Sequence, residues 1–215
     1  MPAAWFDAGC RRCPRLAGFL DEVRTTHPAY HAAPVPPFGD PAARLLIVGL
    51  APGMHGANRS GRPFTGDHAG ILLYEVLHRL GLGSRASSVA VGDGLELHGC
   101  RITNAVKCLP PANKPTPAEV RACRPWLAAE LAEGRPVAVL ALGRIAHDGV
   151  LDALGLRRAG YPFAHGAEHG LPGGPRLVDS YHCSRYNTQT RRLTPEMFLE
   201  VMARAAQLAG VGDWR

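Results

Sequence analysis

The 215-residue chain lacks the segments that would direct it into a membrane or out of the cell. No charged stretch followed by an apolar core opens the chain, and no apolar run approaches the roughly 20 residues needed to cross a bilayer. Cysteine is also scarce, because six residues are too few for a secreted disulfide scaffold of this length. We therefore expect a cytoplasmic protein without a membrane partner, whose cysteines are free thiols or metal ligands.

Two common phosphate-binding motifs are missing as well, although the chain contains 25 glycines. Neither G-x-x-x-x-G-K-[ST] nor G-x-G-x-x-G occurs, which excludes both of these nucleotide-binding loops. Internal repeats and low-complexity tracts are also lacking. The formal charge of +6 and the pI of about 9.3 favour an anionic partner such as DNA, although basic enzymes of small metabolites are also common.

Short apolar runs alternate with helical patterns along the chain, which is typical of a parallel sheet covered by helices on both faces. The expected strands cover residues 45–50, 101–107, 137–142 and 177–181. The expected helices cover residues 71–80, 117–133, 145–154 and 195–208. Two of these helices begin with a capping threonine followed by proline, at Thr116 and Thr194. We therefore predict a single α/β domain over residues 1–215.

Three further segments carry weaker patterns. Residues 91–100 hold turn residues around a short alternating piece, which predicts a hairpin or a short extra strand. Residues 155–175 are rich in Gly, Pro and His, and we expect them to form a long surface loop. The five prolines in residues 28–41 indicate an extended connector.

The first candidate site is the glycine-rich segment 49–67, which directly follows the first expected strand. Open α/β sheets bind ligands at the carboxyl ends of their strands, so this position favours a binding role over a mere connection with solvated charges. Its glycines let the backbone approach a ligand closely, and its last residue, Asp67, supplies a carboxylate. Phe64 either plugs the core beneath the loop or stacks on a flat ligand, and we favour stacking.

Two other expected strands lead into polar side chains. Asn104 interrupts an apolar strand, and its amide can either pair with the edge of a base or satisfy nearby backbone. Asn113 lies among prolines, where it fits a turn residue or a group that places a water. His182 can donate to a substrate oxygen that gains charge, although a lone histidine is more often structural, and Arg185 and Tyr186 beside it can contact phosphates and bases. Because the carboxyl ends of parallel strands share one edge, we expect these loops to converge.

Four of the cysteines have a spacing that suits a metal centre. Cys10 and Cys13 form a C-x-x-C pair, and Cys108 and Cys123 form a second, wider pair. Four thiolates can bind Zn²⁺ or an iron-sulfur cluster, and the spacing does not choose between them. The other two cysteines are expected to be buried apolar residues: Cys100 and Cys183.

Taken together, these segments resemble the iron-sulfur uracil-DNA glycosylases of bacteria and archaea, in particular family 5, also called type b. The resemblance rests on Gly-Leu-Ala-Pro-Gly at 49–53, Asn-Arg-Ser-Gly-Arg-Pro-Phe-Thr-Gly-Asp at 58–67, Ile-Thr-Asn-Ala-Val-Lys-Cys at 102–108, Pro-Pro-Ala-Asn-Lys-Pro-Thr-Pro at 110–117 and Tyr-His-Cys-Ser-Arg-Tyr-Asn at 181–187. With the cysteines, it spans residues 10–187.

The resemblance implies a three-layer α/β/α sandwich with a mainly parallel sheet. It implies an enzyme that flips uracil out of DNA and hydrolyses its N-glycosidic bond, leaving an abasic site at the start of base excision repair. The implied cofactor is a structural [4Fe-4S] cluster, with zinc as the alternative, on Cys10, Cys13, Cys108 and Cys123. The expected partner is double-stranded DNA, and also single-stranded DNA, containing deaminated bases, and the expected state is a monomer.

The resemblance also suggests a role for each site residue. Related family 4 enzymes carry an acidic residue soon after Ala-Pro-Gly, where this chain has Met54-His55-Gly56. We therefore expect the catalytic carboxylate at Asp67, which would stabilise the sugar cation and orient the attacking water. Asn113 is the alternative residue for orienting the water. The expected catalytic residues are Asp67, Asn104 and His182. The expected substrate contacts are Gly49, Ala51, Phe64, Asn104 and His182. The expected DNA contacts are Arg59, Arg62, Ser184, Arg185, Tyr186 and Asn187.

Two questions stay open on the sequence alone. Similar family members also accept deaminated purines, so hypoxanthine and xanthine are candidate substrates, and Cys183 replaces the proline of the usual His-Pro-Ser motif. The alternative function is a noncatalytic iron-sulfur or zinc protein that binds damaged or abasic DNA. That alternative explains the charge and the cysteines, but not the convergence of an acid, an amide and a histidine.

Overall fold

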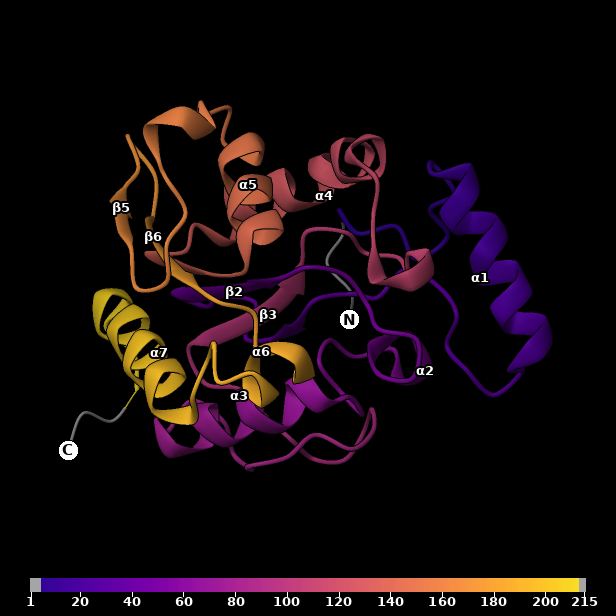
Figure 1. Ribbon diagram of the computed structural model, residues 1–215, viewed down its shortest axis with the longest axis horizontal. Helices are drawn as coiled ribbons and strands as arrows, with labels where there is room; N and C mark the ends of the chain where they lie inside the picture. The colour runs from indigo at the N-terminus through magenta and orange to yellow at the C-terminus, as the bar shows by residue number, and fades with distance from the viewer. Residues whose placement is uncertain (1–4, 213–215) are drawn as a thin grey trace.

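The computed structural model describes residues 5–212, which place a six-stranded sheet between two layers of helices (Figure 1). The strand order is β1-β3-β2-β4-β6-β5. The four central strands run parallel: β2 (Leu45–Gly49), β3 (Cys100–Asn104), β4 (Ala138–Leu142) and β6 (Arg176–Ser180). Two short antiparallel strands form the edges: β1 (Phe38–Gly39) and β5 (Glu168–Gly170). The predicted α/β sandwich with a mainly parallel sheet is confirmed.

Each face of the sheet is covered by a pair of helices. Side chains alternate between the faces along a strand, so Ile47 packs with α3 (His68–Arg79) and α7 (Pro195–Ala209), while its neighbours Leu46 and Val48 pack with α4 (Pro117–Gly134) and α5 (Arg144–Ala153). In Figure 1, α4 and α5 lie above the sheet, and α3 and α7 lie below it. The apolar strands are buried on both sides, as a parallel sheet requires.

An unpredicted helix, α1 (Pro14–Thr26), lies at one end of the molecule (Figure 1). Its buried Leu16 packs with Val106 and Cys123, and its Leu20 and Val23 pack near Leu109. Shorter helical pieces occur in the loops: α2 (Ala57–Ser60), η1 (Pro111–Asn113), η2 (Arg158–Gly160) and α6 (Arg185–Gln189). Through these contacts α1 covers the segment that follows β3.

Two sequence-based expectations for the loops are wrong. Residues 91–100 form no hairpin; the pairing outside the named strands in residues 5–212 is an isolated bridge between Gly83 and Leu97. The expected loop 155–175 contains the edge strand β5, whose residues Glu168, His169 and Gly170 carry no strand signal. Helix α3 also begins three residues before the expected position 71, because the Asp67 side chain caps it.

Candidate active site

The carboxyl ends of β2, β3, β4 and β6 surround a cavity of about 670 Å³. The loops expected to converge do so here, as parallel strands require. Of the predicted site residues, the cavity is lined by Ala51, Phe64, Asp67, Asn104, His182, Ser184 and Arg185. Asn113 lines it as well. The loop 49–67 thus shares this cavity with Asn104 at the end of β3 and with the loop after β6.

Asp67 caps helix α3 and also lines the cavity. Its Oδ1 accepts a hydrogen bond from Gly70 N at 2.9 Å, which caps α3. Burial raises the pKa of this carboxyl above its ordinary value, against the lowering effect of the backbone hydrogen bonds from Gly70 and Ala69. A side chain at Gly56 would overlap the carboxyl group, so glycine at that position makes room for it. Asp67 is therefore held in one place.

Phe64 lies in the left-handed backbone region, with a φ of 54°, although it is not glycine. The turn is fixed by its neighbours, since the Tyr74 hydroxyl donates to Pro63 O at 2.7 Å. Its ring is nearly parallel to that of His182, with centroids 5.9 Å apart and planes at 26°. Backbone strain of this kind persists where the surroundings enforce it, often at functional sites.

Gly49 has a different part from the substrate contact we expected, because it does not line the cavity. A Cβ at this position would overlap both Asn104 Oδ1 and the Phe64 ring. The glycine therefore allows these two side chains to approach the end of β2. The structure thus gives Gly49 a packing role, and its contact with substrate stays a prediction.

Asn104 ends β3 and is almost fully buried. Its Oδ1 has no hydrogen-bond partner among the residues that the structure describes. An unpaired buried acceptor costs roughly 1–3 kcal/mol, so such an atom at a cavity wall is suited to a donor brought by a ligand.

His182 follows β6 and faces Phe64. Burial lowers its pKa to about 4, so the ring is neutral near pH 7. Its carbonyl accepts a hydrogen bond from Asn187 Nδ2 at 2.8 Å, and the Ser184 hydroxyl caps α6 by accepting from Asn187 N. Ser184 and Asn187, expected as DNA contacts, thus hold the His182 loop in shape.

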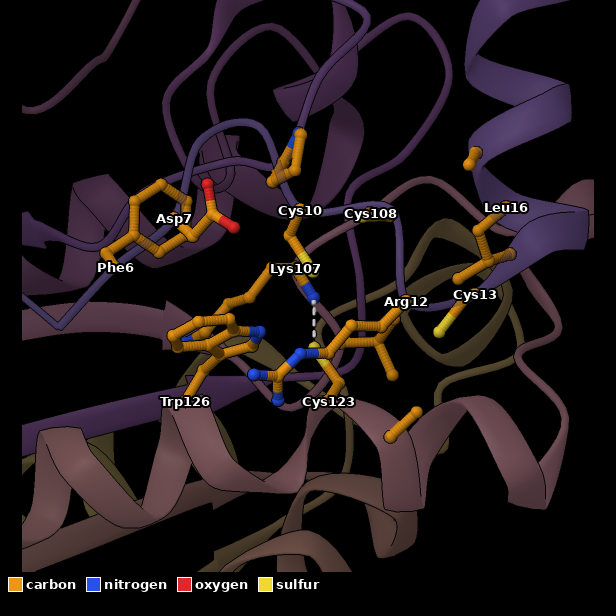
Figure 2. Close-up of a pocket in the computed structure, with 14 residues that line it drawn as sticks. Phe6, Asp7, Cys10, Arg12, Cys13, Leu16, Lys107, Cys108, Cys123 and Trp126 are labelled. Atoms are coloured by element: carbon orange, nitrogen blue, oxygen red, sulfur yellow. Dashed lines mark hydrogen bonds between the residues drawn. The ribbon is translucent and has the colours of Figure 1, made fainter.

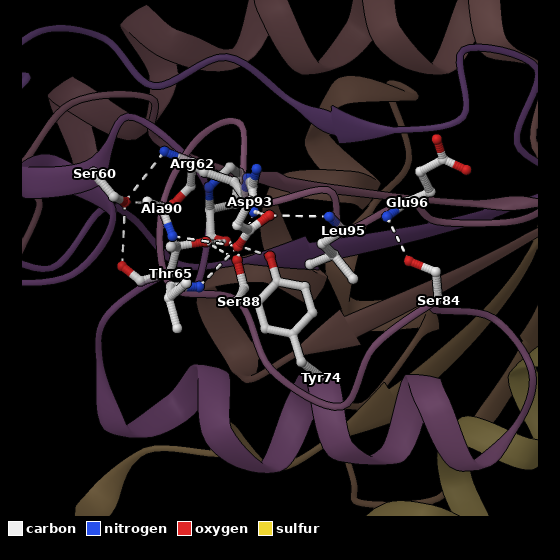
Figure 3. Close-up of polar contacts among 12 residues, drawn as sticks. Ser60, Arg62, Thr65, Tyr74, Ser84, Ser88, Ala90, Asp93, Leu95 and Glu96 are labelled. Atoms are coloured by element: carbon white, nitrogen blue, oxygen red, sulfur yellow. Dashed lines mark hydrogen bonds and ion pairs between the residues drawn. The ribbon is translucent and has the colours of Figure 1, made fainter.

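The other expected DNA contacts divide into exposed and buried side chains. Arg59 and Arg185 are exposed, and Tyr186 is 70% exposed. Arg62 is only 5% exposed, and its Nη1 donates to Asp93 Oδ1 at 2.8 Å and to Ser88 Oγ at 2.9 Å (Figure 3). The prediction that Arg62 binds DNA is therefore wrong, because its guanidinium is committed to a buried ion pair.

The loop after β4 also enters the cavity, and we had not singled it out from the sequence. Gly143, Arg144 and Ile145 line the cavity wall. The Arg144 guanidinium lies 5.2 Å from the centre of the Phe163 ring, which supports it from behind. Their position in the sequence could have indicated this role, since these residues directly follow the expected strand 137–142.

Comparison with known proteins identifies the family of this chain. A family model described as the uracil DNA glycosylase superfamily matches residues 36–206. The chain belongs to this superfamily. The match covers the four central strands and the residues that line the catalytic cavity at their carboxyl ends.

Within the superfamily, the chain groups with the type-5 proteins. It is 54% identical to the type-5 uracil-DNA glycosylase of Thermus thermophilus over 94% of each chain. It is 45% identical to the type-5 uracil-DNA glycosylase of Pyrobaculum aerophilum over 97% of this chain and 96% of that one. A type-4 uracil-DNA glycosylase of the latter organism is 39% identical over only 60% of this chain. The predicted assignment to family 5 is confirmed.

A second site of this superfamily member is built from the four predicted cysteines. Cys10, Cys13, Cys108 and Cys123 line one small cavity between the N-terminal segment, the residues after β3 and α4 (Figure 2). Lys107 N donates to Cys123 Sγ at 3.2 Å. Cys100 and Cys183 are buried elsewhere, as expected.

A separate group of metal-ligating side chains lies away from the four cysteines. Among residues 5–212, the group of His, Cys, Asp or Glu ligand atoms found within 4.8 Å of one another is His147, His169 and Asp179. In the same part of the chain, no helix is long and apolar enough to span a bilayer.

Proposed function

We propose that this protein excises uracil from DNA by hydrolysing the N-glycosidic bond, leaving an abasic site for base excision repair. It would act as a monomer in the cytoplasm, on double-stranded and also single-stranded DNA. The observation that carries the proposal is the unpaired, buried Oδ1 of Asn104 in a cavity that also holds Phe64, Asp67 and a neutral His182. Type-5 relatives over nearly the whole chain support the same activity.

Base recognition would depend on Asn104. Uracil presents an N–H group beside a carbonyl, and that N–H can donate to the free Oδ1. Cytosine has an acceptor nitrogen at the same position, which would leave Oδ1 facing another acceptor. Flipping the base costs a few kcal/mol, less for a mispaired uracil, and Phe64 would supply a flat apolar surface for it.

Bond cleavage would depend on His182 and Asp67. As the C1′–N1 bond breaks, its electron pair leaves with the base, and the sugar becomes cationic. A neutral His182 can donate a hydrogen bond to the base oxygen that gains this charge. The carboxylate of Asp67 can stabilise the sugar cation and orient the water that adds to C1′ and releases its proton to solvent.

The cavity also has room for larger deaminated bases. Hypoxanthine and xanthine present the same N–H and carbonyl edge as uracil, because deamination of a purine creates that edge too. Asn104 would therefore read a chemical feature shared by all of these bases. We propose them as additional substrates, which the volume of about 670 Å³ accommodates.

The test is single-turnover excision from a defined duplex with one uracil opposite guanine. We expect an abasic product, and the same assay with hypoxanthine, xanthine and thymine, in duplex and single strand, measures the substrate range. The control is an identical duplex with cytosine at the target position. Tight binding of the uracil duplex without any abasic product would support the noncatalytic DNA-binding alternative instead.

The four cysteines would hold a [4Fe-4S] cluster. The four thiols line one small cavity, and the resemblance to iron-sulfur glycosylases favours a cluster over zinc. The Lys107 N–H bonded to Cys123 Sγ is the kind of donor that cluster thiolates accept. The cluster would supply no chemistry to the reaction; it would tie the start of α1 to α4 and to the segment after β3. Zinc is the alternative.

The cofactor is tested on protein purified without oxygen. We expect a brown protein with iron and sulfide near four each per chain, as this cluster type requires. Removal of the metal by a chelator should lower the thermal unfolding temperature, since four ligands from three segments would lose their common centre. A colourless preparation that contains zinc would overturn the assignment.

A further inference from the structure

A second cavity, of about 430 Å³, opens beside the catalytic cavity. The two share a wall formed by Gly66, Asp67 and His68, and Arg185 also borders both. The function proposed above uses only the first cavity. The far wall of the second is formed by Ile71 of α3 and by residues 86–89.

Segment 86–89 has no helix or strand, yet it is firmly anchored (Figure 3). The carboxylate of Asp93 accepts from Arg62 Nη1 and from the backbone N atoms of Val89, Ala90 and Leu95. Ser88 adds a hydrogen bond of 2.7 Å between its hydroxyl and that of Thr65. A buried ion pair and four backbone or hydroxyl contacts thus give this wall a defined shape before any ligand arrives.

The wall presents apolar groups to solvent. Ile71 is 64% exposed and Val89 is 69% exposed, and both line the same cavity. Single exposed apolar side chains are ordinary, but two of them in one cavity beside an active site indicate a contact surface. The hydroxyls of Ser87 and Ser88 and the guanidinium of Arg185 complete the lining.

We propose that this second cavity binds the nucleoside directly next to the flipped nucleotide, in the same strand. The inference rests on the proposed function. In this arrangement the strand whose target nucleotide enters the first cavity continues over the shared wall at Gly66–His68, so that its next nucleotide reaches the second cavity. Arg185 borders both cavities, where it meets the phosphate that joins the two nucleotides. Ile71 and Val89 pack on the face of the neighbouring base, and the serine hydroxyls contact its edge.

Val89→Asp tests the proposal on the whole protein. It places a charged carboxylate in the apolar lining on which the face of the neighbouring base would pack. Val89 is exposed, so the substitution should leave the fold intact. We expect the enzyme concentration that gives half-maximal single-turnover excision of uracil to rise about tenfold, the equivalent of one good base contact, with an unchanged maximal rate. The uncharged Val89→Ser should give a smaller change in the same direction.

The matched control is Val91→Asp. Val91 lies two residues beyond segment 86–89, is 65% exposed and lines neither cavity, so this variant adds the same charge without touching the proposed site. We expect it to behave like the wild type. The Val89→Asp effect should also vanish on a duplex in which one flanking nucleotide of the uracil strand is a base-free spacer.

The position of the bound base is read directly by 2-aminopurine placed beside the uracil. Its fluorescence should rise on binding of the wild type and rise less with Val89→Asp. Equal behaviour of Val89→Asp, Val91→Asp and the wild type would overturn the inference, and so would an effect that vanishes only with a spacer in the opposite strand. In either case an active wild type leaves the proposed function intact, whereas an inactive wild type refutes that function itself.

Discussion

At the scale of single residues, the pKa values of Asp67 and His182, which both line the catalytic cavity, are shifted in opposite directions by the same cause. Burial raises the pKa of Asp67 and lowers that of His182 to about 4. Desolvation disfavours charge on each group, so an acid becomes weaker and an imidazolium less stable. An acidic group and a neutral hydrogen-bond donor thus line the same cavity, which suits a reaction that creates a cation on the sugar and an anion on the base.

Asp67→Asn should slow the chemical step by about 10² to 10⁴-fold while DNA binding changes little, because charge stabilisation is lost only in the transition state. The amide retains an acceptor for the α3 cap, so the fold is preserved. The wild-type rate should fall as pH drops through the raised pKa of Asp67, and the variant should lose that dependence. Single-turnover rates from acid to neutral pH measure both effects. Unchanged rates in the variant would remove Asp67 from the mechanism.

Asn104→Ala should lower uracil excision by about 100-fold and narrow the preference for uracil over cytosine, because the buried acceptor that reads the base is gone. The hypoxanthine rate should fall in parallel, since the same edge is recognised. Competing duplexes with each base at one position provide the comparison. A loss of uracil excision with the base preference intact would show that Asn104 does not read the base.

At the scale of elements, local signals in the sequence predicted much of the fold. The capping threonine and proline at Thr116 predicted the start of α4, and in the structure Glu119 completes a reciprocal cap with Thr116. The four apolar runs gave the parallel strands, because strands buried on both faces carry continuous apolar sequence. The exposed β5 lacks such a run, and α1 depends on contacts with residues after β3. Neither element could therefore be predicted from its own local sequence.

The same limit explains which site residues the sequence could locate. Asp67 and His182 lie in loops that follow recognisable strands, and Asn104 lies near the end of another, so their convergence was predictable. Arg62 looked like a DNA contact because it stands in a polar loop, but its partner Asp93 is 31 residues away along the chain. No local sequence pattern predicts an ion pair between residues so far apart in the chain. Arg144, in contrast, follows an expected strand and was accessible to the same reasoning.

Arg62→Met and Arg59→Met separate the structural arginine from the exposed one. Arg62→Met leaves Asp93 buried without its partner, so the free energy of unfolding should fall by about 3–5 kcal/mol. Arg59→Met should leave stability unchanged but weaken DNA binding and reduce its salt dependence by about one counterion. Urea unfolding and binding across a salt series measure the two properties. A stability loss in Arg59→Met, or none in Arg62→Met, would contradict this division.

At the scale of the whole molecule, a buried cluster joins three elements behind the catalytic cavity. His147 of α5 meets Asp179 of β6 through Nδ1 at 2.7 Å and the carbonyl of Tyr161 through Nε2 at 2.9 Å. His169 of β5 contacts the other oxygen of Asp179 at 3.2 Å. Both ring nitrogens of His147 face acceptors, so the protonated form satisfies both. The cluster fixes the helix whose first residue, Arg144, lines the cavity.

This cluster makes the stability of the protein depend on pH. Burial alone would lower the pKa of His147, but the hydrogen bond and the charge of Asp179 raise it above its ordinary value. The stabilisation is therefore complete below the pKa of the unfolded chain, about 6.5, and is lost as pH rises through the higher folded value. His147→Gln should lower the free energy of unfolding by about 1.5–3 kcal/mol near pH 5.5 and by less near pH 8.5, in urea titrations. The exposed His98→Gln is the control for the loss of a surface histidine. A deficit of His147→Gln that stays constant or grows with pH would show that His147 is neutral in the folded protein.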